Sequence, residues 1–176
     1  ISAVGGDSSA VVTFSGAVAN GSTITSYTVQ AYDGSGSAVS GATCTATTSA
    51  TNGSCTITGL TNGSQYTFKA VTNSTANSSA VSSVASIATA AVTPAKAPEA
   101  PTGITTTAGT GKVTVGWTEP ADNGSAITSY TVQAYDNAGN AVAAAMAPVP
   151  TRKPRRVVLI VMLLPPILSL LATCQH

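Results

Sequence analysis

An internal repeat with a period of about one hundred residues constrains this chain more than any other feature. The fourteen residues from Asn20 to Asp33 recur from Asn123 to Asp136, and only Thr23, which becomes Ala126, differs. The offset is 103 residues, far longer than the roughly 20–45 residues of a solenoid repeat. It matches the length of a whole small domain, so the sequence predicts two similar domains in tandem.

The local pattern within the repeat is typical of β-structure. Short runs rich in Val, Thr, Ile and Tyr alternate with clusters of Gly, Asn and Ser, as in all-β sandwiches and barrels. No window within residues 1–142 has a helical period. In the first copy we expect six strands, near Ala10–Ser15, Thr25–Asp33, Ala42–Thr45, Cys55–Thr58, Gln65–Thr72 and Ser83–Ala91.

The alternation of apolar residues predicts which side chains form the core. Tyr27 and Val29 fall on one face of a strand, and Tyr66 and Phe68 on one face of another. The predicted core consists of these residues, other large apolar residues and their repeat counterparts: Phe14, Tyr27, Val29, Ile57, Leu60, Tyr66, Phe68, Trp117, Tyr130 and Val132.

Composition shifts divide the chain into four parts. Residues 1–92 hold the first copy, which begins at Ile1, the counterpart of Ile104, so we expect the chain to be a piece of a longer protein. Residues 93–101 contain three prolines, which favour an extended, semi-rigid linker. The second copy covers residues 102–142, stops matching after Val142, and should bury too little sheet to fold stably alone. Residues 143–176 form a tail that does not match.

The charges and the single histidine exclude several functions. Charged residues make up only 7% of the chain, against about 25% in an average domain, and the net charge is +1. No basic stripe that could bind nucleic acid is present. The only histidine is the last residue, His176, so residues 1–175 hold no Ser-His-Asp triad and no zinc site with a histidine ligand. We expect no enzyme activity, no cofactor and no metal.

The tail allows three interpretations. Basic residues between Arg152 and Arg156 precede the uncharged run Val157–Thr173, which Pro165 and Pro166 interrupt. As a helix this run would be about 25 Å long, slightly short of a bilayer core of roughly 30 Å. The tail could be foreign to the domain, as an out-of-frame or fusion end. It could also be a membrane segment or another apolar association segment.

The spaced motifs of both copies resemble the fibronectin type III domain. The second copy has Pro101-Thr-Gly-Ile104, Trp117 and the segment Tyr130-Thr-Val-Gln-Ala-Tyr-Asp136. The first copy has Phe14 where the family has Trp, then Tyr27-Thr-Val-Gln-Ala31, and Gly59-Leu-Thr-Asn-Gly-Ser-Gln-Tyr-Thr-Phe68. The Ala, Ser, Thr and Gly content resembles tandem copies from secreted bacterial proteins.

This resemblance implies an immunoglobulin-like β-sandwich, with one near-complete copy and a partial second copy. It makes Tyr66 the tyrosine-corner residue, with its hydroxyl bound to backbone near Leu60. Because the resemblance implies secretion, we expect Cys44 and Cys55 to form a disulfide, with two buried free thiols as the alternative.

The implied function is that of spacer or interaction modules in a larger extracellular or cell-surface protein. The partners would be neighbouring domains of the parent chain, and possibly a protein or polysaccharide ligand. Alternatives are an accessory region of a secreted polysaccharide-degrading enzyme, or an adhesin segment that binds protein or glycan. The sequence identifies neither the parent protein nor a ligand.

Other candidate sites favour simple structural interpretations. The predicted loops Gly16–Thr23 and Asn73–Ser79 lack the Trp, Tyr and Arg that dominate binding hot spots. Glu119 and Asp122 could form an acid pair, but the first copy lacks both carboxylates. Six Asn-x-Ser/Thr sequons could accept glycans, although turn chemistry explains them as well. They begin at Asn20, Asn52, Asn62, Asn73, Asn77 and Asn123.

Overall fold

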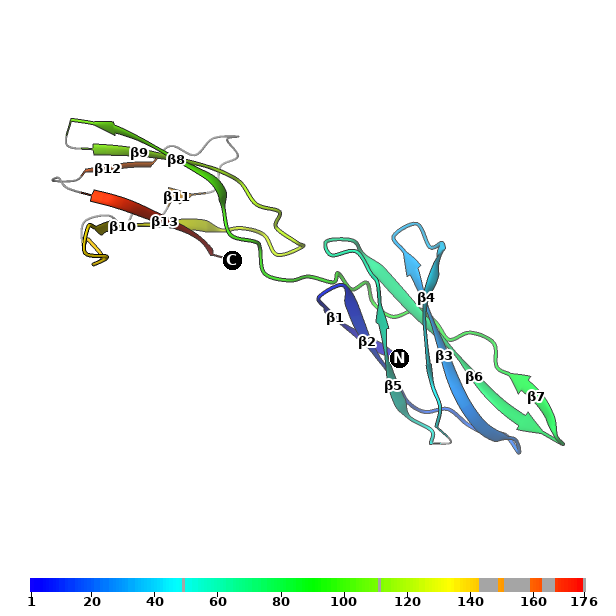
Figure 1. Cartoon of the computed structure of the whole chain (residues 1–176). Coiled ribbons are helices and arrows are strands. Elements are labelled where there is room, and N and C mark those ends of the chain that lie inside the picture. The colour runs from blue at the N-terminus through cyan, green and yellow to red at the C-terminus, as the bar shows by residue number, and fades with distance from the viewer. Residues whose placement is uncertain (49, 111, 143–148, 151–158, 163–166, 176) are drawn as a thin grey trace. The chain divides into compact units, whose positions relative to one another are not determined.

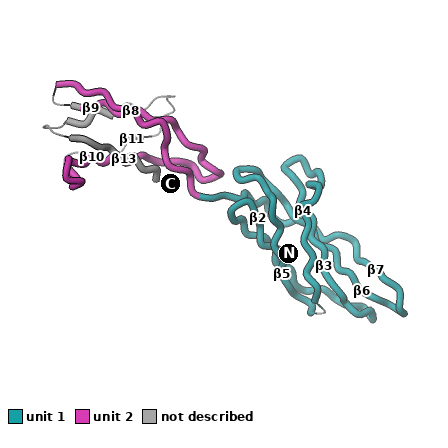
Figure 2. The backbone as a smooth tube through the Cα atoms, viewed as in Figure 1, with its two compact units in different colours: residues 1–96 teal, residues 97–176 magenta. Residues whose placement is uncertain are grey.

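The computed structural model describes residues 1–176 except 49, 111, 143–148, 151–158, 163–166 and 176. The chain divides into two compact units, unit 1 from Ile1 to Lys96 and unit 2 from Ala97 to His176 (Figure 2). Every regular element among the described residues is a β-strand, so the predicted all-β class is confirmed. Among these residues no helix is long and apolar enough to span a membrane.

Unit 1 is a sandwich of two antiparallel sheets (Figure 1). One sheet has the order β1-β2-β5 and the other the order β4-β3-β6-β7. The strands are β1 (Ser2–Gly6), β2 (Ser9–Phe14), β3 (Thr23–Asp33), β4 (Ala38–Ala46), β5 (Gly53–Thr58), β6 (Tyr66–Ala76) and β7 (Ser79–Ser82).

The core of unit 1 lies between these sheets and follows the two-residue alternation of each strand. Val12 on β2, Val29 on β3 and Phe68 on β6 have no exposed surface. All seven predicted core residues of the first copy are buried: Phe14, Tyr27, Val29, Ile57, Leu60, Tyr66 and Phe68.

Two strands, β1 and β7, lie where the sequence pattern predicts none. β7 pairs with β6 through a two-residue turn, in which Asn77 and Ser78 have φ values of 49° and 64°. The prediction of a loop over Asn73–Ser79 was therefore wrong, because left-handed residues make a tight hairpin and allow β6 to continue to Ala76.

The predicted strand Ser83–Ala91 was also wrong, because this segment follows β6 with a step of three residues. The N–H groups of Ser83, Ser86 and Thr89 donate to carbonyls two residues apart on β6, those of Thr72, Ala70 and Phe68 respectively. In return, the β6 N–H groups donate to the hydroxyls of Ser83, Ser86 and Thr89. Because side-chain oxygens replace backbone carbonyls, no regular ladder forms. We call residues 83–92 the edge segment.

The first residues of the proline-rich segment are held against unit 1. Pro94 is fully buried, and its carbonyl accepts a hydrogen bond from Gly63 N–H at 2.9 Å. Ala95 N–H donates to the carbonyl of Gly6. A Cβ on Gly5 would lie 2.9 Å from the carbonyl oxygen of Thr93, so only glycine permits this close approach.

Unit 2 repeats this plan with strands from both the second copy and the tail. The strands are β8 (Thr102–Gly109), β9 (Lys112–Thr118), β10 (Ser129–Asp136), β11 (Val149–Pro150), β12 (Leu159–Met162) and β13 (Ile167–Gln175). Their sheets have the orders β12-β9-β8 and β11-β10-β13. The second-copy core residues Val115, Trp117, Tyr130, Val132 and Ala134 are buried.

The tail strands take the places that β5 and β6 occupy in unit 1. β12 pairs with β9 as β5 pairs with β2, with Leu159 opposite Val115. β13 pairs with β10 as β6 pairs with β3, with Ala172 opposite Val132. The described parts of the apolar run are therefore extended strands. The basic cluster Arg152–Arg156 lies outside the described residues.

Candidate functional site

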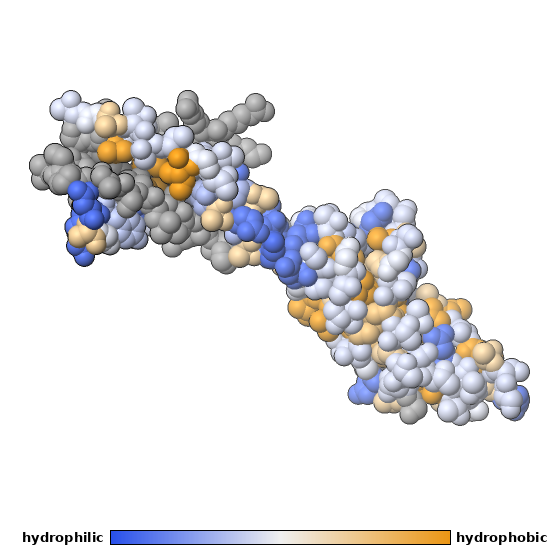
Figure 3. Space-filling model, viewed as in Figure 1, coloured by the Kyte–Doolittle hydropathy of each residue, from blue (hydrophilic) through white to orange (hydrophobic). Residues whose placement is uncertain are grey.

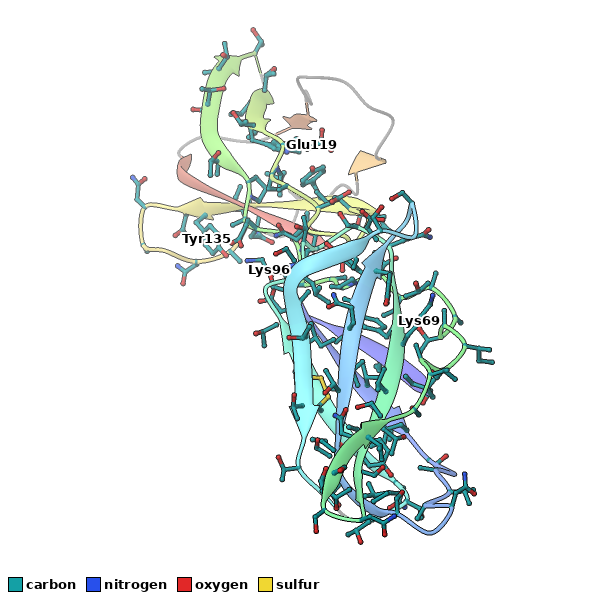
Figure 4. All side chains as sticks on the ribbon, turned by 90° about the vertical axis from the view of Figure 1, so that its right-hand side faces the viewer. Lys69, Lys96, Glu119 and Tyr135 are labelled. Carbon is teal, nitrogen blue, oxygen red and sulfur yellow. A yellow bond between two sulfur atoms is a disulfide. The ribbon has the colours of Figure 1, made fainter. Side chains whose placement is uncertain are left out.

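The disulfide between Cys44 and Cys55 is present, which confirms the predicted pairing. Their Cα atoms are 5.9 Å apart, and both residues are half-buried beside the core (Figure 4). Cys44 belongs to β4 and Cys55 to β5, so the bond joins an edge strand of one sheet to an edge strand of the other. It therefore fastens the two layers of unit 1 together along one side.

The tyrosine corner predicted at Tyr66 is confirmed. Thr61 N–H donates to the Tyr66 hydroxyl at 3.1 Å, and Leu60 N–H donates to the carbonyl of Ser8. These bonds hold the turn between β5 and β6 while Leu60 enters the core. Tyr66 thus fixes a connection between the two sheets.

Equivalent aromatic pairs occupy the cores of both units. The ring centres of Phe14 and Tyr27 are 4.3 Å apart in unit 1, and those of Trp117 and Tyr130 are 5.1 Å apart in unit 2. The Tyr27 hydroxyl donates to the carbonyl of Ala50 at 2.8 Å. The repeat therefore preserves packing as well as sequence.

Repeat-related aspartates stabilise the turn that ends β3 and the turn that ends β10. Asp33 Oδ1 accepts from the Ser35 hydroxyl and from the N–H groups of Ser35 and Ser37. The Ser35 hydroxyl contributes most, with the Ser37 N–H, to lowering the pKa of Asp33 below 3.8. The Asn140 N–H is the main cause of the lowered pKa of Asp136. These half-buried carboxylates organise the two turns.

A third aspartate connects two turns at one end of unit 1. Asn62 Nδ2 donates to Asp7 Oδ1 at 2.8 Å, and Asn62 Oδ1 accepts from Ser8 N–H at 2.8 Å. The bond from Asn62 is the main cause of the lowered pKa of Asp7. The sequon residue Asn62 therefore has a structural role in this turn.

The other sequon asparagines lie in turns, in a strand and in a loop. Asn20, Asn77 and Asn123 have φ values near 50°, which supports turn chemistry at these positions. Asn73 lies within β6, where its side chain binds Ser26, Thr28 and Ser82. Asn52 is exposed immediately before β5.

Two surface cavities of unit 1 are lined by small polar and apolar residues. One, of about 290 Å³, lies beside Phe14, Gly16 and Tyr27 and the edge segment. The other, of about 460 Å³, lies beside Val18, Asn20 and β7. No charged side chain lines either cavity, and the surface in view carries small, separate apolar patches (Figure 3).

The aromatic side chains of unit 1 form no exposed stacking platform within its described residues. Phe14, Tyr27, Tyr66 and Phe68 are buried. Tyr32 is half-buried, and Lys69 on β6 places its Nζ 4.7 Å from the centre of the Tyr32 ring (Figure 4).

The remaining acidic candidates, Glu119 and Asp122, both lie in the connection that follows β9. Asp122 Oδ1 accepts from Gly124 N–H at 3.1 Å, which is a turn contact. Glu119 follows β9 (Figure 4). The described residues contain no group of three His, Cys, Asp or Glu side chains that could hold a metal ion.

Comparison with known proteins identifies the fold of unit 1. Residues 1–87 match the family model of the fibronectin type III domain. The strands, the tyrosine corner and the core of this fibronectin type III unit agree with that match. No curated protein matches the chain.

The chain also aligns with the crystal structure of the FN1–FN3 domains of chicken CNTN1. The identity is 16% and the TM-score is 0.48. The alignment covers 98% of this chain and 60% of the CNTN1 chain. This chain therefore spans less than two thirds of the length of the CNTN1 chain.

The edge segment is one feature that the sequence pattern did not predict, as are β1, β7 and the tail strands. Ser83, Ser86 and Thr89 are spaced by three residues, whereas a strand alternates every two. This spacing of hydroxyl residues beside exposed Val84 and Ile87 was the available signal.

Proposed function

We propose that the chain supplies non-catalytic spacer modules to a larger secreted or cell-surface protein, with neighbouring domains of the parent chain as its partners. The main support for this proposal is that the first residues of the proline-rich segment are hydrogen-bonded to unit 1. Pro94 and Ala95 are bound to unit 1, and Ala97 accepts a hydrogen bond from Asn123 in unit 2.

The proposed mechanism is geometric. A short linker with prolines restricts the directions in which one module can leave the next. A series of such modules would hold a terminal domain away from a surface. This requires modules that stay folded, and the disulfide and the tyrosine corner serve that requirement.

An extracellular location agrees with the disulfide, because such bonds persist mainly in oxidising compartments. A spacer role is favoured over glycan binding because four aromatic side chains of unit 1 are buried, and the Lys69 ammonium lies over the half-buried Tyr32 ring. A role beside a polysaccharide-degrading domain remains compatible with a spacer, since the catalytic chemistry would lie elsewhere.

Small-angle X-ray scattering tests the geometric role. The variant Pro98→Gly with Ala100→Gly should show a broader distribution of overall dimensions than the unaltered chain. Ala138→Gly, in an exposed turn, should leave the distribution unchanged. An unaltered chain that is already as broad as the linker variant would contradict the proposal.

Incubation of the full chain with insoluble cellulose and chitin tests the binding alternative. A spacer should remain in the supernatant at all protein concentrations. Saturable retention on either polysaccharide would instead identify a glycan-binding module.

A further inference from the structure

Four Asn-Gly pairs make this chain susceptible to one specific covalent change. They begin at Asn20, Asn52, Asn62 and Asn123. In such pairs the backbone nitrogen of glycine can attack the side-chain amide carbon of asparagine. The new C–N bond closes a succinimide ring, and the amide nitrogen leaves as ammonia. Water then opens the ring to aspartate or isoaspartate, so no other reactant is needed.

The contacts of Asn62 protect it from this reaction. Its oxygen accepts from Ser8 N–H, and its nitrogen donates to Asp7. The attacking nitrogen, that of Gly63, is itself committed to the carbonyl of Pro94. Three hydrogen bonds must therefore break before the ring can close.

Asn20 and Asn123 offer a direct comparison, because both begin the tripeptide Asn-Gly-Ser at the same position of the repeat. Their φ values are 47° and 51°. Each turn is closed by an equivalent backbone bond, from Ser22 to Ala19 in unit 1 and from Ser125 to Asp122 in unit 2. The backbone conformation thus does not distinguish the two sites.

The surrounding side chains do distinguish them. In unit 2 the Gly124 N–H donates to Asp122 Oδ1, and Asn123 Nδ2 donates to the carbonyl of Ala97. In unit 1 the residue equivalent to Asp122 is Ala19, which has no carboxylate. Neither the exposed Asn20 side chain nor the Gly21 N–H makes a hydrogen bond within the described residues.

Asn52 is exposed, but its attacking nitrogen lies in a strand. Gly53 begins β5 opposite Phe14, and a Cβ on Gly53 would lie 2.9 Å from the Phe14 ring. Moving the Gly53 nitrogen onto the Asn52 side chain would therefore disturb the ladder and the aromatic core.

We propose that Asn20 is a selective site of spontaneous deamidation, which converts it to isoaspartate or aspartate while the other three Asn-Gly pairs are retained. The product adds a negative charge to the connection between β2 and β3, beside the cavity that Val18 and Asn20 line. When isoaspartate forms, the main chain also gains one atom at this turn. This inference does not depend on the proposed spacer role.

The test is to incubate the full chain at mildly alkaline pH and follow each site by peptide mapping with mass spectrometry. Each additional hydrogen bond to be broken should slow the reaction about fivefold. On that basis Asn123 should react roughly twentyfold more slowly than Asn20, and Asn62 on the order of a hundredfold more slowly. In the urea-denatured, reduced chain the four rates should converge.

Reciprocal variants provide the matched control. Ala19→Asp should slow the reaction at Asn20, and Asp122→Ala should accelerate it at Asn123. Thermal unfolding of each variant would exclude a rate change caused by loss of the fold. Equal rates at Asn20 and Asn123 in the folded chain, or faster reaction at Asn52 or Asn62, would overturn the proposal.

Discussion

At the level of single residues, several asparagines of this chain suit the backbone conformation of the turns in which they lie. Asn20, Asn77 and Asn123 adopt left-handed conformations that asparagine tolerates better than most residues. Ser78 is less well suited, because its φ of 64° brings its Cβ close to the backbone. The chain thus tolerates one unfavourable residue in the turn between β6 and β7.

Replacing Ser78 by glycine should stabilise unit 1 by about 1 kcal/mol, because glycine adopts the left-handed conformation without strain. Urea unfolding would measure the change. Ser79→Gly is the matched control, since this neighbour lies in extended β7 and its replacement should be destabilising. A Ser78→Gly variant no more stable than the unaltered chain would contradict this account of the turn.

The turn aspartates should make stability depend on acid pH. Asp33 has a lowered pKa in the folded chain, so the unfolded chain takes up a proton first as the pH falls. The stabilising contribution is complete above 3.8, the ordinary pKa, and disappears as pH falls through the lower folded value.

Asp33→Asn should therefore lose less stability than the unaltered chain when the urea midpoint at pH 6 is compared with that at pH 2. Acid should still destabilise the Asp33→Asn variant, because Asp7 and Asp136 also have lowered pKa values. Identical pH profiles would show that Asp33 makes no such contribution.

At the level of elements, the edge segment shows how side chains can replace backbone groups in a sheet. Ala70 N–H donates to the Ser86 hydroxyl at 3.0 Å, and this hydroxyl donates in turn to the carbonyl of Ile87 at 2.8 Å. The hydroxyls of Ser83, Ser86 and Thr89 thus each accept a hydrogen bond from β6 and donate one to a carbonyl of the edge segment. Val92, which lacks a hydroxyl, exchanges ordinary backbone bonds with Tyr66.

Ser86→Ala should destabilise unit 1 by about 1–3 kcal/mol, because the N–H of Ala70 loses its acceptor. Chemical denaturation would measure the loss, and hydrogen exchange at Ala70 would localise it. Ser79→Ala, at an exposed position of β7, should have little effect. Equal losses of stability for the two substitutions would show that the hydrogen bond from Ala70 to the Ser86 hydroxyl does not stabilise unit 1.

Sequence patterns predicted the elements that alternate every two residues and missed the others. β2, β3, β5 and β6 were predicted because large apolar side chains mark their inner faces, and the predicted strand Ala42–Thr45 lies within β4. β1 was missed because its sequence, Ser-Ala-Val-Gly-Gly, carries little apolar signal. The edge segment was misjudged because its period of three arises from long-range bonds to β6, which no local propensity encodes.

At the level of the whole molecule, each unit needs strands from distant parts of its sequence. Unit 1 joins β1 and β2 to β5, and unit 2 joins β8 and β9 to β12. The repeat predicted the second-copy core residues Trp117, Tyr130 and Val132, which are buried. The strands of the tail were not predicted, because an apolar run without alternation fits a helix as well as a buried strand.

The disulfide should contribute a large share of the stability of unit 1. Its 11-residue separation corresponds to about 3 kcal/mol in the chain-entropy estimate. The double variant Cys44→Ala, Cys55→Ala should unfold at a lower urea concentration and become insensitive to reductant in this unit. An unaltered chain whose unfolding midpoint is the same with and without reductant would contradict this role.

The edge segment also affects the risk that similar modules of one chain exchange strands during folding. Two stretches as alike as Asn20–Asp33 and Asn123–Asp136 could pair with each other's partners during synthesis, because either could form the same sheet. A flat strand edge would invite such mispairing. The three-residue step of residues 83–92 does not match the two-residue step of an incoming strand. Two modules that share such a stretch should therefore fold with less risk of exchanging strands.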